Sequence, residues 1–111
     1  MTASLAGERC AACHPGTPRL TVAEIDELRT QLADAWAVDG GVLRARFTFR
    51  DFASAFAQAT RIAAVAERER HHPELAVGWG HLDVELVTHA IGGLSRNDFI
   101  LAARIDELMA G

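Results

Sequence analysis

The chain has 111 residues and a formal net charge of −4; half of its residues are hydrophobic and 23% are charged. This length predicts one domain, and the composition is that of an ordinary water-soluble protein. There is no lysine and no run of basic residues, so a nucleic-acid partner is not expected. No apolar run is long enough to cross a bilayer, and Met1 to Arg9 does not read as a signal peptide, which predicts a cytoplasmic protein without a membrane partner.

Residues 1–19 are rich in Gly, Pro, Ser and Thr and predict an irregular N-terminal arm, with residues 20–111 as a single domain. Cys10 and Cys13, followed by His14, have the spacing of a haem attachment site or of half a zinc site. Haem attachment normally follows export, and a structural zinc needs two further ligands. We therefore expect a reduced cysteine pair in a flexible leader, outside the functional centre. A zinc site with ligands from elsewhere is the weaker alternative.

The first helix is predicted to start at Thr21, because Thr21 and Glu24 form a capping-box pattern. Its apolar residues recur at helical spacing, and the helix should be over by Trp36; they are Ile25, Leu28, Leu32 and Ala35.

A hairpin is predicted around Asp39-Gly40-Gly41, where glycine can supply the positive φ of a tight turn. The following strand, Leu43 to Arg50, alternates apolar and polar residues, which predicts one buried face and one solvated face.

Asp51 is a suitable N-cap for a second helix that should run to about Arg68. Its predicted core stripe is Phe52, Ala55, Phe56, Ala59, Ile62, Ala63 and Ala66. Further apolar residues leave this helix apolar around most of its circumference: Ala53, Ala57, Ala64 and Val65. Two interpretations stay open, a self-association surface and the plain use of alanine as a good helix former.

Pro73 disfavours helical geometry at His72, so the second helix must stop there. Two more strands should follow. Leu75, Val77 and Trp79 alternate along the third, and the buried face of the fourth is formed by Leu82, Val84 and Leu86. Ser95 and Asp98 then form a capping-box pattern for a last helix. The predicted fold is α+β, a four-stranded antiparallel sheet with three helices on one face, in the order α-β-β-α-β-β-α.

Three histidines fall close to the predicted junctions of these elements. His71 and His72 lie where the second helix ends, and His89 lies at the end of the fourth strand, on the face that Asp83 and Glu85 share. Histidine exchanges its proton near neutral pH, so this group predicts proton transfer, or a zinc site, for which three histidines are a common ligand count. Glu67 and Asp98 could each orient an imidazole, although a solvated carboxylate and a simple helix cap are the plainer interpretations.

The spacing Glu67-x3-His71-His72-Pro73-x5-Trp79-x9-His89-x8-Asp98 resembles the signature of the pterin-4a-carbinolamine dehydratases. The phrases Phe49-Arg50-Asp51-Phe52, Gly93-Leu94-Ser95 and Asn97-Asp98-Phe99 are also similar to that family, particularly to its bacterial members. The similarity covers roughly residues 20–110.

This resemblance implies dehydration of 4a-hydroxytetrahydropterin to quinonoid dihydropterin, the recycling step after aromatic amino-acid hydroxylation. It implies acid/base and substrate-holding roles for His71, His72 and His89, with His71 and His89 beside the departing hydroxyl and His72 holding the pterin. Further substrate-binding or orienting residues would be Glu67, Pro73, Thr88 and Asp98. No metal or other cofactor is required.

The family also implies a homodimer or homotetramer, joined through sheet edges and the middle helix.

Two rival functions are open. One is a non-catalytic binding protein on the same scaffold, either a RuBisCO assembly factor or a transcriptional coactivator with a protein partner. The other is a metal hydrolase that uses the same three histidines.

Overall fold

A computed structural model of the chain describes residues 4–110. Its main elements are α1 (Val22–Arg29), β1 (Ala37–Asp39), β2 (Val42–Thr48), α2 (Phe52–Glu69), β3 (Glu74–Gly78), β4 (His81–Leu86) and α3 (Arg96–Ala110). Two short 3₁₀ helices, η1 (Leu5–Gly7) and η2 (His89–Ile91), lie in the arm and after β4. The α+β class and the predicted order α-β-β-α-β-β-α are confirmed. In the described part of the chain, no helix is long and apolar enough to cross a membrane.

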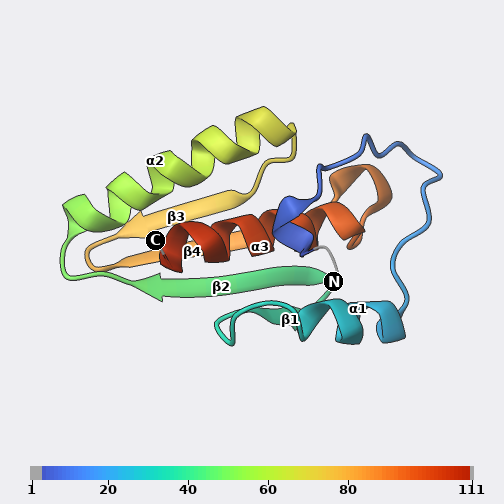
Figure 1. The fold of residues 1–111 in the computed structure, drawn as a ribbon, viewed down its shortest axis with the longest axis horizontal. Helices are drawn as coiled ribbons and strands as arrows, with labels where there is room; N and C mark the ends of the chain where they lie inside the picture. Colours follow the sequence, from blue (N-terminus) through green and yellow to red (C-terminus); the bar gives the residue numbers. More distant parts are fainter. Residues whose placement is uncertain (1–3, 111) are drawn as a thin grey trace.

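The four strands form one antiparallel sheet in the order β1-β2-β4-β3 (Figure 1). The β1–β2 hairpin turns through Gly40 and Gly41, whose φ angles of 61° and 80° are those a two-residue hairpin turn requires. The central strands β2 and β4 bury alternate side chains against the helices, namely Leu43, Ala45, Leu82, Val84 and Leu86. The opposite face of the sheet carries charged pairs such as Arg46–Asp83.

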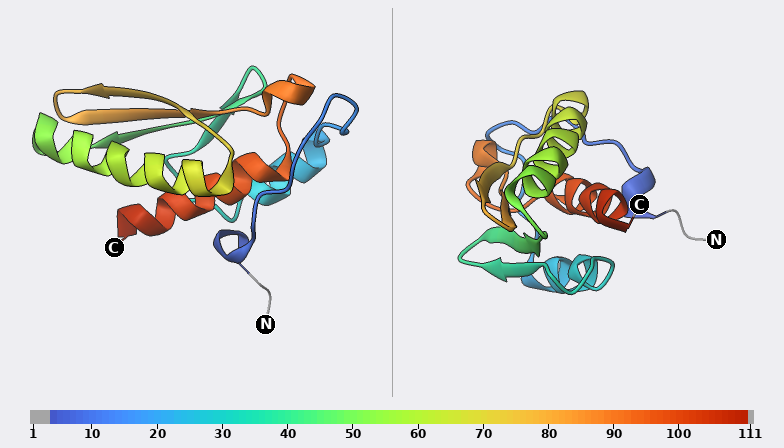
Figure 2. Two further views of the ribbon diagram at one scale, coloured as in Figure 1. Left: turned by 90° about the horizontal axis from the view of Figure 1, so that it is seen from above. Right: turned by 90° about the vertical axis from the view of Figure 1, so that its left-hand side faces the viewer.

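The helices lie on one side of the sheet, as Figure 2 shows from two directions. Helix α3 contributes the largest share of the core, including Phe99, Leu101 and Ile105. Trp36 closes the core beside β2, with its ring edge-on to Phe47 at 5.8 Å and its indole N–H donated to Asp106. The linker between α1 and β1 is thereby fixed to α3.

Two predicted local structures are confirmed by their hydrogen bonds. Thr21 and Glu24 form the complete capping box of α1. The Asp51 side chain accepts the Ser54 N–H at the start of α2. Helix α1 nevertheless ends at Arg29, well before Trp36, and a series of turns carries the chain to β1.

The predicted core stripe of α2 is partly wrong. Phe52, Phe56 and Ala63 are exposed, whereas Val65 is buried together with Ala55, Ala59, Ile62 and Ala66. Because α2 is apolar on two adjacent faces, helical periodicity allows either face to be the buried one. The structure buries the face that also carries Gln58 and Glu69.

Two other predictions need correction. Trp79 is not in the third strand, which ends at Gly78; it lies in the β3–β4 turn and is largely exposed. The N-terminal arm is irregular, as predicted, but it is not a loose leader. Leu5 is buried in the core, and η1 packs against α3.

Candidate active site

A pocket of about 430 Å³ lies at one end of the sheet. Three segments line it: Cys10–Cys13 of the arm, the end of α2 from Glu69 to His72, and the chain after β4 from Val87 to Ala90, together with Asn97. All three predicted histidines therefore face one pocket, although His89 lies 17 positions after His72. The volume is in the range of small-molecule sites in proteins.

His71 is positioned by the way α2 ends. Arg70 adopts a left-handed conformation, with φ of 55°, and the His71 N–H donates to the Ala66 carbonyl at 3.2 Å. This ending is typical of a helix C-terminus and turns the chain sharply. The imidazole Nε2 then lies 2.6 Å from Oδ1 of Asp98. The side chain of His71 is 12% exposed and that of Asp98 is fully buried.

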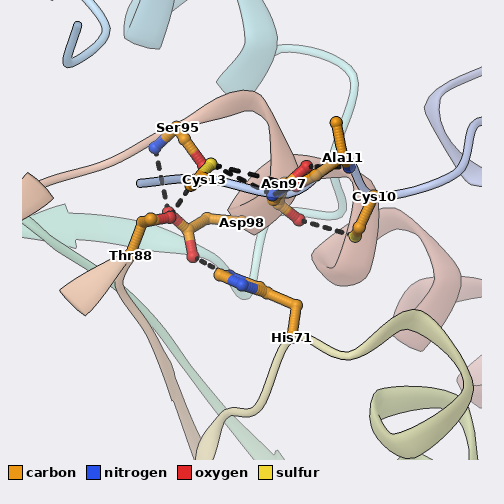
Figure 3. Close-up of polar contacts among 8 residues, drawn as sticks. All are labelled: Cys10, Ala11, Cys13, His71, Thr88, Ser95, Asn97 and Asp98. Carbon is orange, nitrogen blue, oxygen red and sulfur yellow. Dashed lines mark hydrogen bonds and ion pairs between the residues drawn. The ribbon is translucent and has the colours of Figure 1, made fainter. Parts of the chain in front are cut away.

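Asp98 collects hydrogen bonds from three separate segments. Its Oδ2 accepts the Ser95 N–H at 3.0 Å and the Thr88 hydroxyl at 2.8 Å, while Oδ1 meets His71 (Figure 3). Both oxygens of this fully buried side chain therefore have hydrogen-bond partners. Asp98 thus accepts an N–H at the start of α3 and also faces an imidazole. Only half of the predicted capping box forms, because the Ser95 hydroxyl bonds to Thr88.

Thr88 supports this carboxylate with groups that are already engaged. Its hydroxyl lies between Asp98 and Ser95, its N–H donates to the Gly93 carbonyl at 3.0 Å, and its carbonyl accepts the Ile91 N–H. Thr88 therefore holds the Asp98 carboxylate in place.

His72 and Glu67 form a different kind of pair. The two side chains meet at 2.5 Å, but they are 60% and 76% exposed. Solvent screens such a pair, so it fixes His72 only weakly. Glu67 and Pro73 are not among the residues that line the pocket. Pro73 follows the two histidines where the chain turns toward β3.

The sequence predicted His89 at the end of the fourth strand, but the structure places it at the start of η2. The strand ends at Leu86, and the loop is closed by a bridge between Thr88 and Gly93. Arg19 secures the far end of η2 through its Nε, which donates to the Ile91 carbonyl at 2.8 Å. His89 is exposed at the rim of the pocket.

The arm is the part of the site that the sequence did not reveal. Cys10 and Cys13, expected in a leader away from the functional centre, line the pocket with the alanines between them. Asn97 and Glu69 hold this segment by hydrogen bonds to the backbone of Ala11 and Cys10. No local pattern links residue 10 to residues 69 and 97, because such contacts depend on the tertiary fold.

The two cysteines are free thiols, and both are partly buried. Burial, reinforced by the negative charge of Glu69, raises the pKa of the Cys10 thiol to about 11. The Cys10 N–H in turn lowers the pKa of the Glu69 carboxyl by donating to it, with Arg104 and Arg9 adding to the effect. Within residues 4–110, no three His, Cys, Asp or Glu side chains are grouped so as to hold a metal ion.

Comparison with known proteins gives a consistent result. Residues 18–108 match the family model described as pterin 4 alpha carbinolamine dehydratase. A Rickettsia bellii protein is 45% identical over 109 residues, covering 97% of this chain and 96% of its own. A Nitrosospira multiformis protein is 43% identical over 104 residues, covering 94% and 91%. The names of both relatives assign them to the pterin-4-alpha-carbinolamine dehydratases by inference.

A solved structure from Brucella melitensis is also similar. It is described as a transcriptional coactivator/pterin dehydratase and is 34% identical, with a TM-score of 0.76. The match covers 82% of this chain and 98% of the Brucella chain.

Proposed function

The chain belongs to the pterin 4 alpha carbinolamine dehydratase family, and from this premise we propose that it dehydrates 4a-hydroxytetrahydrobiopterin or a closely related pterin. The product would be quinonoid dihydropterin, which returns to the tetrahydropterin pool that aromatic amino-acid hydroxylases use. The observation that carries the proposal is the hydrogen bond between His71 and the buried Asp98, at a pocket of small-molecule size.

The reaction needs an acid for the departing hydroxyl. With Nε2 of His71 held by Asp98, Nδ1 is the ring nitrogen left for the substrate. The carboxylate stabilises the imidazolium, so His71 can give a proton to the 4a-hydroxyl as its C–O bond breaks and water leaves. A general acid of this kind contributes about 10²–10⁴-fold in rate.

The reaction also needs a base. The N5 electron pair forms the new double bond to C4a, and the N5 proton passes to a neutral imidazole or to water. His89, at the rim, is the proposed partner of His71 beside the hydroxyl, and His72 is proposed to hold the pterin ring. Glu67, through His72, and Pro73, at the turn that follows, take orienting roles outside the pocket. The sequence of steps requires no redox change and no covalent intermediate.

The test is the decay of freshly generated 4a-hydroxytetrahydropterin, with and without the protein, and with and without a chelator. We expect strong acceleration that the chelator leaves unchanged, and a product with the spectrum of quinonoid dihydropterin. Acceleration that the chelator abolishes would favour the metal-dependent alternative, and decay at the spontaneous rate would overturn the proposal.

A second candidate, a non-catalytic binding protein, has one observation in its favour. The Brucella relative is described as a coactivator as well as a dehydratase. A protein kept only for binding has no need of a hydrogen-bonded histidine facing a pocket, and this chain keeps His71, His72 and His89 there. Folded protein without any effect on the pterin would leave the binding role as the better account.

We further propose that the chain forms a homodimer or homotetramer. The exposed phenylalanines of α2, Phe52 and Phe56, are 48% and 54% exposed and lie in contact with each other. Large exposed apolar side chains on one helix face are typical of an association surface. The edge strands β1 and β3 offer further pairing surfaces.

A further inference from the structure

The arm segment Cys10–Cys13, called the arm wall below, forms one side of the pocket that holds the three histidines. It precedes residue 18, where the match to the family model begins. We propose that the arm wall is part of the substrate site and limits which pterins enter it, with Asn97 and Glu69 as its positioning residues. This inference rests on the proposed dehydratase function.

The first anchor of the arm wall is a buried carboxylate. The Glu69 side chain is almost wholly buried, accepts the Cys10 N–H at 2.9 Å and pairs with Arg9 at 2.9 Å. Burying a carboxylate is costly unless partners offset the loss of water. This charge has no place in the proposed proton transfers. Holding the arm wall is the role that its contacts indicate.

The second anchor is Asn97, which binds the arm as a neighbouring strand would. Its Oδ1 accepts the Ala11 N–H at 2.9 Å, and its Nδ2 donates to the Ala11 carbonyl at 2.6 Å. The two thiols meet the same residue, Cys10 at the Asn97 carbonyl and Cys13 at Nδ2 (Figure 3). Four contacts thus fix three of the four residues of the arm wall.

Leu5 and Glu8, which precede the arm wall, are also held by contacts that need no ligand. Leu5 is buried in the core, and Arg96 donates two hydrogen bonds to the Glu8 carboxylate at 2.8 and 2.7 Å. Arg104 donates to the Glu8 carbonyl. A wall ordered in advance adds contacts without the entropic cost of ordering a loop on binding.

The anchors lie next to the proposed acid. Glu69 is two residues before His71, and Asn97 directly precedes Asp98. The arm wall and the His71–Asp98 pair therefore share the end of α2 and the first turn of α3 as supports. The middle residues of the arm wall, Ala11 and Ala12, are exposed and small. A larger side chain there would fill space that a substrate needs.

The test compares Ala12→Trp with His14→Trp. His14 is also exposed and in the arm, but it does not line the pocket. We expect Ala12→Trp to raise KM for 4a-hydroxytetrahydropterin by about tenfold or more, equivalent to about 1.4 kcal/mol, with a smaller change in kcat. His14→Trp should behave as wild type. Circular dichroism should show that both variants are folded. Equal KM values for the two would then overturn the proposal that the arm wall is part of the substrate site, but not the dehydratase function.

A second measurement does not depend on turnover. In Cys10→Ser, the remaining thiol is Cys13, which lines the pocket. Saturating 7,8-dihydropterin should slow the alkylation of Cys13 by iodoacetamide several-fold. Bound dihydropterin with no change in the alkylation rate would overturn the proposal. No pterin binding and no turnover by the wild type would overturn the proposed function and the arm wall together.

Discussion

Asp98 is the residue on which the candidate site depends most. One oxygen faces His71, and the other holds Ser95 and Thr88, so a single buried carboxylate joins His71 to the start of α3. Both uses are visible in the sequence, because Asp98 stands three residues after Ser95 and at a matching position of the family signature. The engagement of Thr88 behind it was not visible, since it depends on how the loop after β4 folds back.

Replacing Asp98 with asparagine should lower kcat by about 10²–10⁴-fold, because an amide cannot stabilise the His71 imidazolium. KM should change little, since Asp98 lies behind the histidine. Steady-state kinetics checks this, with Glu67→Gln as the control. Glu67 holds the exposed His72 through a screened contact, so its variant should lose only a few-fold. Equal losses of kcat in the two variants would contradict the greater importance of the His71–Asp98 pair over the His72–Glu67 pair.

The Cys10 thiol gives a prediction for pH. Burial raises its pKa to about 11, so the folded state favours the neutral thiol more than the unfolded state does. The free energy of unfolding should therefore fall as pH rises from about 9 toward 11, and Cys10→Ser should flatten that fall. Because the chain has no lysine and no tyrosine, the two cysteines are the only side chains that titrate there. Urea unfolding at several alkaline pH values measures this fall in the free energy of unfolding. A wild-type profile as flat as that of the serine variant would refute the burial of Cys10.

At the scale of elements, the starts of α1 and α2 and the end of α2 could be predicted, whereas the buried face of α2 could not. Thr21, Asp51 and Pro73 act within a few residues of themselves, and each boundary lies where the local chemistry puts it. Phe52 and Phe56 were assigned to the core because they are apolar at helical spacing. A helix with two apolar faces is oriented by the whole set of tertiary contacts, and here the face with Ala55 and Ile62 is buried.

The end of α2 offers a stability prediction. Arg70 takes a left-handed conformation that glycine adopts without a steric penalty. Arg70→Gly should raise the free energy of unfolding by about 0.5–1 kcal/mol, since the relief of strain exceeds the added entropy of the unfolded chain. Arg68→Gly, inside the helix, should lower it by about 1 kcal/mol. Urea denaturation distinguishes the two signs. Destabilisation by both variants would show that Arg70 makes contacts that outweigh its backbone strain.

At the scale of the whole molecule, the element order and an antiparallel sheet with helices on one face could be predicted from alternation in the strands and from the turn residues. The position of the arm could not be predicted in this way. Its anchors lie about 60 and 86 residues away in sequence, at Glu69 and Asn97, and only the assembled fold brings them to residues 10 and 11. The site is therefore larger than its histidine signature indicates.

The exposed phenylalanines of α2 give a prediction for the mass of the proposed oligomer. Phe56→Glu places a charge on the exposed face of α2 and should reduce the oligomeric mass seen by light scattering, while the circular dichroism spectrum stays unchanged. Val22→Glu is the matched control, because Val22 is even more exposed and lies on α1. An unchanged mass for Phe56→Glu would exclude this helix face as the association surface.

The central claim is that His71, held by Asp98, protonates the departing hydroxyl of a 4a-hydroxytetrahydropterin. Stopped-flow absorbance of the freshly generated substrate, with wild type and with His71→Ala, tests it most directly. We predict strong acceleration by the wild type and a loss of about 10²–10⁴-fold in the variant, with both proteins folded. Acceleration of equal size by both proteins would contradict the role of His71, and no acceleration by either would contradict the dehydratase function itself.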